Sequence, residues 1–114
     1  LNALMAKRRD NKGANRVFKV PPEVDVDNSI SNQFTVIEVA GLDRPGLLYE
    51  LTSALSDLNL DITSAHITTF GERVVDTFYV TDLTNKKIEA PERQTTIRSR
   101  LLTVLAAVPE GVQA

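Results

Sequence analysis

Residues 34–41 constrain the fold most strongly, because they predict a strand that is apolar on both of its faces. A strand of this kind needs cover on both faces. Residues 42–46 (Leu-Asp-Arg-Pro-Gly) end it and begin a helix, in which we expect Asp43 to be the N-cap and Pro45 to lie in the first turn. The apolar residues of this helix recur at helical spacing and are Leu47, Leu48, Leu51, Leu55 and Leu58.

A second strand pair and a second helix follow. Residues 60–70 predict a strand whose apolar parity slips between Ile62 and Ala65, which indicates a bulge. Gly71 suits a tight turn into a partner strand over 74–81. Pro91 fits the first turn of a helix that Pro109 and Gly111 should end, and its apolar stripe consists of Ile97, Leu101, Val104, Leu105 and Val108.

Residues 17–27 precede these elements and predict an edge strand interrupted by Pro21 and Pro22. The order is therefore ββαββα, which predicts an α+β fold with a four-stranded, mainly antiparallel sheet and two helices on one face. The other face must meet water or a partner. Four residues lie on parities that could line it, namely Phe34, Val36, Val75 and Tyr79. This open face implies association, although packing under residues 17–27 is an equal alternative.

Composition limits the functional classes. The chain has 114 residues and 12.6 kDa, so it should form one core. It holds no cysteine and one histidine, His66, which excludes thiolate sites and leaves little for histidine chemistry. No apolar run approaches the roughly 20 residues that cross a bilayer, so we expect no membrane partner.

Charge is distributed unevenly along the chain. Residues 1–20 carry six Lys/Arg against one acidic residue, whereas residues 21–114 carry seven basic and fourteen acidic residues. We expect residues 1–15 to be a basic linker after a preceding helix, residues 16–109 to be the domain and residues 110–114 to be a tail of a longer protein. The linker could contact an acidic partner or nucleic acid, but a solvated linker is the more common case. The acidic domain itself should not bind nucleic acid.

Catalytic motifs are not found. Asp25 and Asp27 have the Asp-x-Asp spacing of a magnesium site, but no phosphate-binding loop precedes them, so we interpret them as edge charges that favour solubility. His66 has no second ligand or serine with which to form a metal site or a triad. We therefore predict no catalytic residue, no metal site and no cofactor in this chain.

Residues 34–48 followed by 58–62 resemble the ACT domain, a ligand-sensing module of amino-acid and nitrogen metabolism, with Asp-Arg-Pro-Gly-Leu-Leu as its hallmark. More narrowly, residues 55–62, 64–67 and 71–82 are similar to the last ACT domain of the bifunctional uridylyltransferase/uridylyl-removing enzymes of the PII nitrogen-signalling protein. The resemblance implies a ferredoxin-like ACT sandwich. It also implies a cytoplasmic parent enzyme that senses glutamine, attaches UMP to PII and removes it, with magnesium in its upstream catalytic domains.

The resemblance also assigns a ligand site between this domain and another ACT domain, in cis or in a homodimer. The implied ligand-binding residues are Asp43, Arg44, Pro45, Gly46, Leu47 and Leu48 in the loop and Asp61, Ile62 and Thr63 in the following strand. At a helix N-terminus, free N–H groups attract an anion, and Gly46 would allow the α-carboxylate of an amino acid to approach. Asp61 stands where many ligand-binding ACT domains have Asn, and it could accept from an ammonium group but not donate to a carboxylate. The alternative is a structural interaction domain without a ligand of its own.

Overall fold

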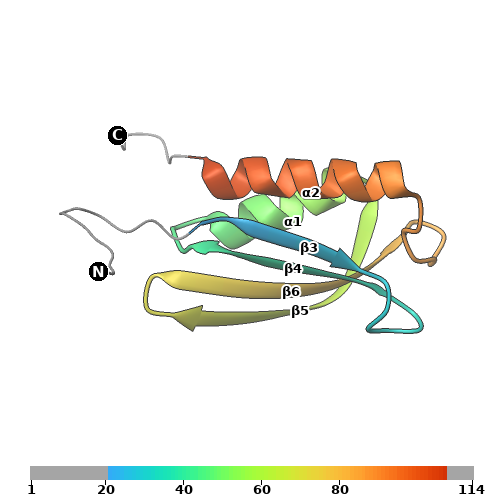
Figure 1. The fold of residues 1–114 in the computed structure, drawn as a ribbon, viewed down its shortest axis with the longest axis horizontal. Coiled ribbons are helices and arrows are strands. Elements are labelled where there is room, and N and C mark those ends of the chain that lie inside the picture. The colour runs from blue at the N-terminus through green and yellow to red at the C-terminus, as the bar shows by residue number, and fades with distance from the viewer. Residues whose placement is uncertain (1–20, 108–114) are drawn as a thin grey trace, which may run out of the picture.

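A computed structural model of the chain describes residues 21–107, which form four strands and two helices (Figure 1). The elements in chain order are β3 (Glu23–Asp27), β4 (Thr35–Leu42), α1 (Leu47–Asp57), β5 (Leu60–Phe70), β6 (Arg73–Asp82) and α2 (Pro91–Ala106). The predicted ββαββα order and α+β class are confirmed. The part of the predicted edge strand before residue 21, the basic linker over 1–15 and the tail lie outside the described residues.

The strands form one antiparallel sheet in the order β3-β4-β6-β5. β4 lies inside the sheet between β3 and β6, in agreement with its apolar residues on both faces. β3 and β5 are the two edges. β3, the first strand in the chain, therefore forms the edge beside β4.

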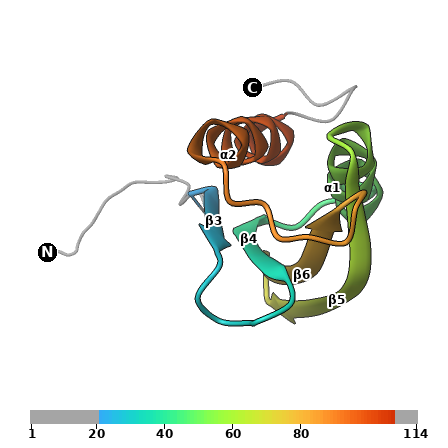
Figure 2. The same ribbon diagram turned by 90° about the vertical axis from the view of Figure 1, so that its right-hand side faces the viewer.

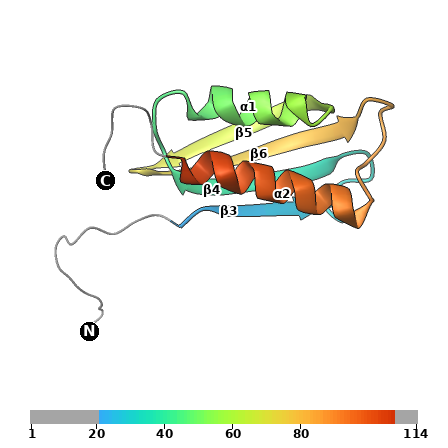
Figure 3. The same ribbon diagram turned by 90° about the horizontal axis from the view of Figure 1, so that it is seen from above.

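Both helices cover the same face of the sheet, as Figures 2 and 3 show from two directions. α2 lies over β3 and β4, whereas α1 lies along β5 and also packs against α2. The core lies between the helices and the sheet. Its fully buried side chains include Ile37, Leu51, Leu55, Phe78 and Leu101.

Local signals in the sequence fix the turns. The register of β5 against β6 shifts between Ile62 and Ser64, which confirms the predicted bulge. Gly71 has φ +61° in the β5–β6 turn. Asn59, which follows the Leu58 C-cap of α1, has φ +62°, a left-handed conformation that asparagine tolerates. Pro91 occupies the first turn of α2, which ends at Ala106, before the expected stop at Pro109.

The predicted N-cap of α1 is wrong. The helix begins at Leu47, its N-cap is Gly46, and no side chain caps it. β4 continues to Leu42, and a turn closed by the Leu47 N–H donating to the Arg44 carbonyl (3.2 Å) separates the strand from the helix. Asp43 is thus three residues too early to cap, and Pro45 precedes the N-cap instead of lying in the first turn.

Candidate functional site

The loop of residues 43–46 joins β4 to α1 and is held at both ends by backbone hydrogen bonds. The Asp43 N–H donates to the Glu72 carbonyl over 2.8 Å, which ties the loop to the β5–β6 turn. Gly46 has φ +80°, a conformation that strains residues with a Cβ atom. An added Cβ at Gly46 would nevertheless meet only Glu50 Oε2, at 3.9 Å, so its surroundings are open. The loop therefore has a defined shape and leaves space above Gly46.

The N-terminus of α1 offers unused hydrogen-bond donors beside this space. Within residues 21–107, neither the Leu48 N–H nor the Tyr49 N–H has an acceptor, because no side chain caps the helix. Free N–H groups and the helix dipole together favour an anion at this end. Glu50 is the acidic residue of the first turn, but Arg44 neutralises it. The site can thus accept a carboxylate group.

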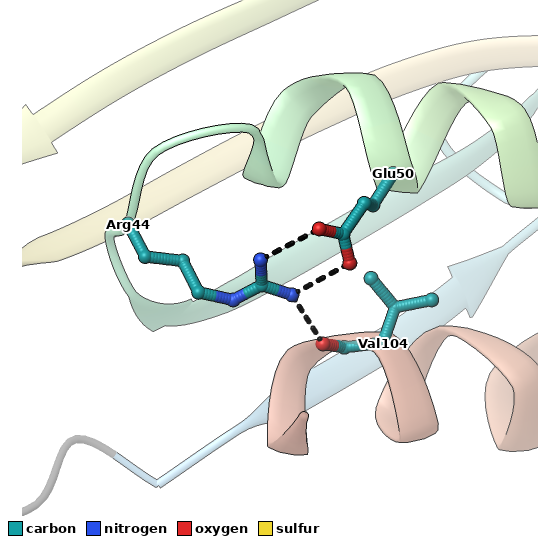
Figure 4. A network of polar contacts seen from close by, with 3 residues as sticks. All are labelled: Arg44, Glu50 and Val104. Carbon is teal, nitrogen blue, oxygen red and sulfur yellow. Dashed lines mark hydrogen bonds and ion pairs between the residues drawn. The ribbon is translucent and has the colours of Figure 1, made fainter. Parts of the chain in front are cut away.

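Arg44 links three elements instead of pointing into the open space (Figure 4). Its Nη1 and Nη2 donate to Glu50 Oε2 and Oε1 over 2.8 and 2.9 Å, and Nη2 also donates to the Val104 carbonyl over 2.9 Å. The hydrogen bond to Glu50 raises the pKa of Arg44 and lowers the pKa of Glu50. The Arg44 side chain is only 10% exposed. It therefore fastens the loop to α1 and to the C-terminal end of α2.

The second group of predicted ligand residues lies elsewhere. Asp61, Ile62 and Thr63 are at the start of β5, directly after the C-terminal end of α1, whereas the loop is at its N-terminal end. α1 has 11 residues and spans about 16 Å, so one chain does not bring the two groups together. Asp61 and Thr63 are exposed and Ile62 is half-buried. Each chain presents two separated half-sites.

β5 forms an accessible edge between these half-sites. It is 11 residues long, pairs with β6 alone among the strands of residues 21–107, and is exposed from Thr63 to Phe70. Apolar side chains gather along it and on the adjacent turn of α1, with exposed fractions of 47% for Ile67, 62% for Phe70 and 44% for Leu48. A long edge strand with exposed apolar neighbours is suited to pairing with another strand.

Asp76 is a buried carboxylate that the sequence analysis did not single out. It is 1% exposed, and among the described residues its Oδ1 has no hydrogen-bond partner. Burial, with a smaller contribution from Asp43, raises its pKa to about 6. The available signal was its parity, because Asp76 lies on the same face of β6 as the core residues Val74, Phe78 and Val80.

Other residues considered for chemistry have ordinary surroundings. Asp27 accepts hydrogen bonds from the N–H and hydroxyl of Ser29, which lower its pKa, as in a turn. His66 packs edge-on against the Tyr79 ring at a centroid distance of 5.6 Å. Over residues 21–107, no three His, Cys, Asp or Glu side chains cluster as metal ligands would. None of the helices described combines the length and hydropathy needed to cross a bilayer.

The fold is that of a small regulatory domain of the ACT type, a class that binds small ligands. Its features are the antiparallel sheet, the two helices on one face and the uncapped helix N-terminus that follows β4. The chain belongs to the family described as the ACR9-like, ACT-like domain, whose family model matches residues 23–108. This confirms the ACT resemblance.

A solved structure agrees with this fold. The crystal structure of an unknown protein from Galdieria sulphuraria is similar to the chain with a TM-score of 0.51 and 22% sequence identity. The similarity covers 62% of this chain and 37% of the Galdieria chain. At this identity the likeness concerns the fold alone, and the chain corresponds to little more than a third of that protein.

Proposed function

We propose that this domain senses a free amino acid, with glutamine as the expected ligand, at a site shared by two ACT domains. The observation that carries the proposal is the uncapped N-terminus of α1, where Leu48 and Tyr49 offer free N–H groups above Gly46. An α-carboxylate matches these donors in charge and size. The ligand would lie on the loop with its carboxylate toward the helix.

The positions of the two half-sites support pairing with a second ACT domain. They lie at opposite ends of α1, so antiparallel pairing of two β5 edges would bring the loop of one domain toward Asp61–Thr63 of the other. The same pairing would cover Ile67 and Leu48, which one domain leaves exposed. The partner domain would be either an ACT domain joined in cis or a second copy of the chain.

In this arrangement the two half-sites would bind different groups of the amino acid. Asp61, from the partner domain, would accept hydrogen bonds from the α-ammonium group. Arg44 would contribute little direct contact with the ligand, because its side chain is only 10% exposed and both of its terminal nitrogens point toward Glu50 and Val104. Arg44 is instead a positioning residue that holds the loop in place for the ligand.

We further propose that the domain regulates a PII uridylyltransferase/uridylyl-removing enzyme in the cytoplasm, where glutamine would control attachment of UMP to PII and its removal. Support comes from the Val-Val-Asp-Thr-Phe-Tyr-Val-Thr-Asp sequence of residues 74–82 together with Asp-Arg-Pro-Gly at 43–46. The transferase and hydrolase reactions, and their magnesium ions, would belong to other domains. Activity assays of the parent protein with and without glutamine would test this assignment.

Isothermal titration of the chain with glutamine tests the ligand proposal, with glutamate and leucine as comparison ligands. Saturable heat that is selective for glutamine is expected at protein concentrations at which two domains pair. Gly46→Val should abolish this heat, because its side chain would fill the space above the loop and strain the backbone. Gly71→Val is the matched control, since Gly71 also has positive φ and an added Cβ there meets nothing within 4 Å.

The alternative function is a structural interaction domain without a ligand of its own. The exposed β5 edge, which is suited to pairing with or without a ligand, favours this possibility. Pairing in sedimentation experiments together with no heat from any amino acid would support it. Glutamine heat that Gly46→Val leaves unchanged would instead refute the assignment of the loop.

A further inference from the structure

The face of the sheet opposite the helices carries a strip of acidic side chains. Glu23, Asp25 and Asp27 alternate with the inward-facing Val24 and Val26 along β3. Asp25 is paired in register with Glu38 of β4, so two carboxylates lie side by side on this face. Arg73 approaches Glu23 at 3.6 Å, and no other ion pair with these four acidic residues is present among the described residues.

Apolar and aromatic groups border the acidic strip. The Tyr79 ring contacts Phe34 and His66 edge-on at centroid distances of 6.2 and 5.6 Å. Two shallow hollows of about 270 and 260 Å³ lie along the strip, and both include Asp25 and Glu38. The first also includes Arg73 and Val75, and the second Thr77 and Tyr79. Carboxylates beside an aromatic ring suit Lys and Arg side chains, which bind both.

Three other occupants fit this face less well. A second copy meeting it face to face would bring like charges together. A nucleic acid would be repelled, because residues 21–107 hold thirteen acidic and seven basic residues. The hollows are also smaller than the roughly 300–1,000 Å³ usual for small-molecule pockets. A basic, extended peptide matches both the charge of the face and its shallow shape.

We propose that the basic segment of this chain, residues 7–19, docks on the acidic strip formed by Glu23, Asp25, Asp27 and Glu38. The segment carries six Lys/Arg and one Asp, and it joins the described domain next to β3, which bears three of the four acidic residues. Thirteen extended residues reach about 43 Å, whereas the eight residues of β4 span about 26 Å. The segment is therefore long enough to cover the strip after one reversal.

Covalent connection strengthens this contact. A tethered segment meets the face at a high effective concentration, so even weak ion pairs produce substantial occupancy. The interaction is between exposed charges, and it should weaken as salt shortens the screening length from about 30 Å at 0.01 M to about 3 Å at 1 M. Occupied in this way, the open face would not be free to bind another basic partner.

A nitroxide spin label on the full chain tests this docking. The chain has no cysteine, so Ala14→Cys provides a single attachment point within residues 7–19. Docking predicts strong paramagnetic broadening of the amide NMR signals of Asp25, Glu38 and Thr77 at 0.01 M salt and its loss at 1 M salt. Amides of α1, on the covered face, should be affected less.

Charge variants make the test specific. The pair Asp25→Lys and Glu38→Lys should abolish the broadening, whereas the matched pair Glu89→Lys and Glu92→Lys, near the start of α2, should preserve it. Replacing Lys7, Arg8 and Arg9 by Gln should reduce it without changing any residue of the described domain.

Three outcomes would overturn the proposal. The first is the absence of broadening at low salt, and the second is broadening that the Asp25/Glu38 pair does not change. The third is broadening that persists when spin-labelled chain is mixed with isotope-labelled chain lacking the label, which would assign the contact to a second copy.

Discussion

The buried carboxylate of Asp76 makes the stability of the domain depend on pH. Its pKa is raised from 3.8 to about 6 by burial and, less strongly, by Asp43. The folded protein therefore binds this proton more tightly than the unfolded chain, and protonation stabilises the fold. This stabilisation is complete below about pH 4 and is lost as the pH rises through 6. Asp76→Asn removes the titration and should remove this part of the pH dependence.

The size of the effect follows from the shift. A difference of about two pH units corresponds to about 3 kcal/mol over the full range. Between pH 5 and pH 7.5, the Asp76 contribution to the free energy of unfolding should fall by about 1.4 kcal/mol. Asp76 is 1% exposed, so solvent screens this effect little. The free energy of unfolding of wild type should thus fall by about 1.4 kcal/mol more than that of Asp76→Asn over this interval.

Urea unfolding of both proteins at the two pH values, at constant ionic strength, measures this difference directly. Other titrating groups cancel, because they are common to the two chains. Asp57→Asn is a control for removing one carboxylate, since Asp57 has a side chain that is 65% exposed. Free energies of unfolding that change equally with pH in wild type and Asp76→Asn, within about 0.3 kcal/mol, would refute this prediction. That result would mean that burial does not raise the pKa of Asp76.

Three further substitutions test the packing around the loop and the core. Arg44→Lys should lower the free energy of unfolding in urea by about 1–2 kcal/mol, because an ammonium group cannot bind both Glu50 oxygens and the Val104 carbonyl; unchanged stability would show that this contact contributes nothing. Gly41→Ala places a Cβ 3.1 Å from Leu105 Cδ2 and should cost about 1 kcal/mol. That cost should shrink when Leu105 is already Ala, and strict additivity in the double-mutant cycle would contradict the clash. Leu101→Ala removes a side chain with 0% exposure and should cost about 2–5 kcal/mol, whereas a thermal midpoint close to that of wild type would place Leu101 outside the core.

Features encoded by neighbouring residues were predictable. The parity slip between Ile62 and Ala65 predicted the bulge that the register shift confirms. Gly71 and Asn59 both have positive φ, which glycine adopts because it lacks a Cβ atom and which asparagine tolerates better than most residues. The order of strands and helices follows from the same kind of local periodicity. Each of these features depends on residues that are close together in the sequence.

Features that depend on distant residues were missed or mistaken. Arg44 contacts Val104, 60 positions later, and no local pattern indicates that partner. Asp43 has the side chain of an N-cap, but β4 extends to Leu42 and its register with Arg73 sets where the chain turns. The inward parity of Asp76 was visible in the sequence, whereas its lack of a partner depends on what the helices place above it.

The chain enters and leaves the described domain at the same end of the sheet. Glu23 is paired with Ala40 near the end of β4, and the last turn of α2 lies against Gly41 and Arg44 (Figure 1). The loop of residues 43–46 lies at this end too, so a displacement there reaches either connection without crossing the length of the domain. If the proposed ligand displaces this loop on binding, thermodynamic linkage makes the coupling reciprocal, so that a load on either connection would change the affinity of the loop for that ligand. The loop and both points at which the chain continues beyond residues 21–107 thus share one end of the fold.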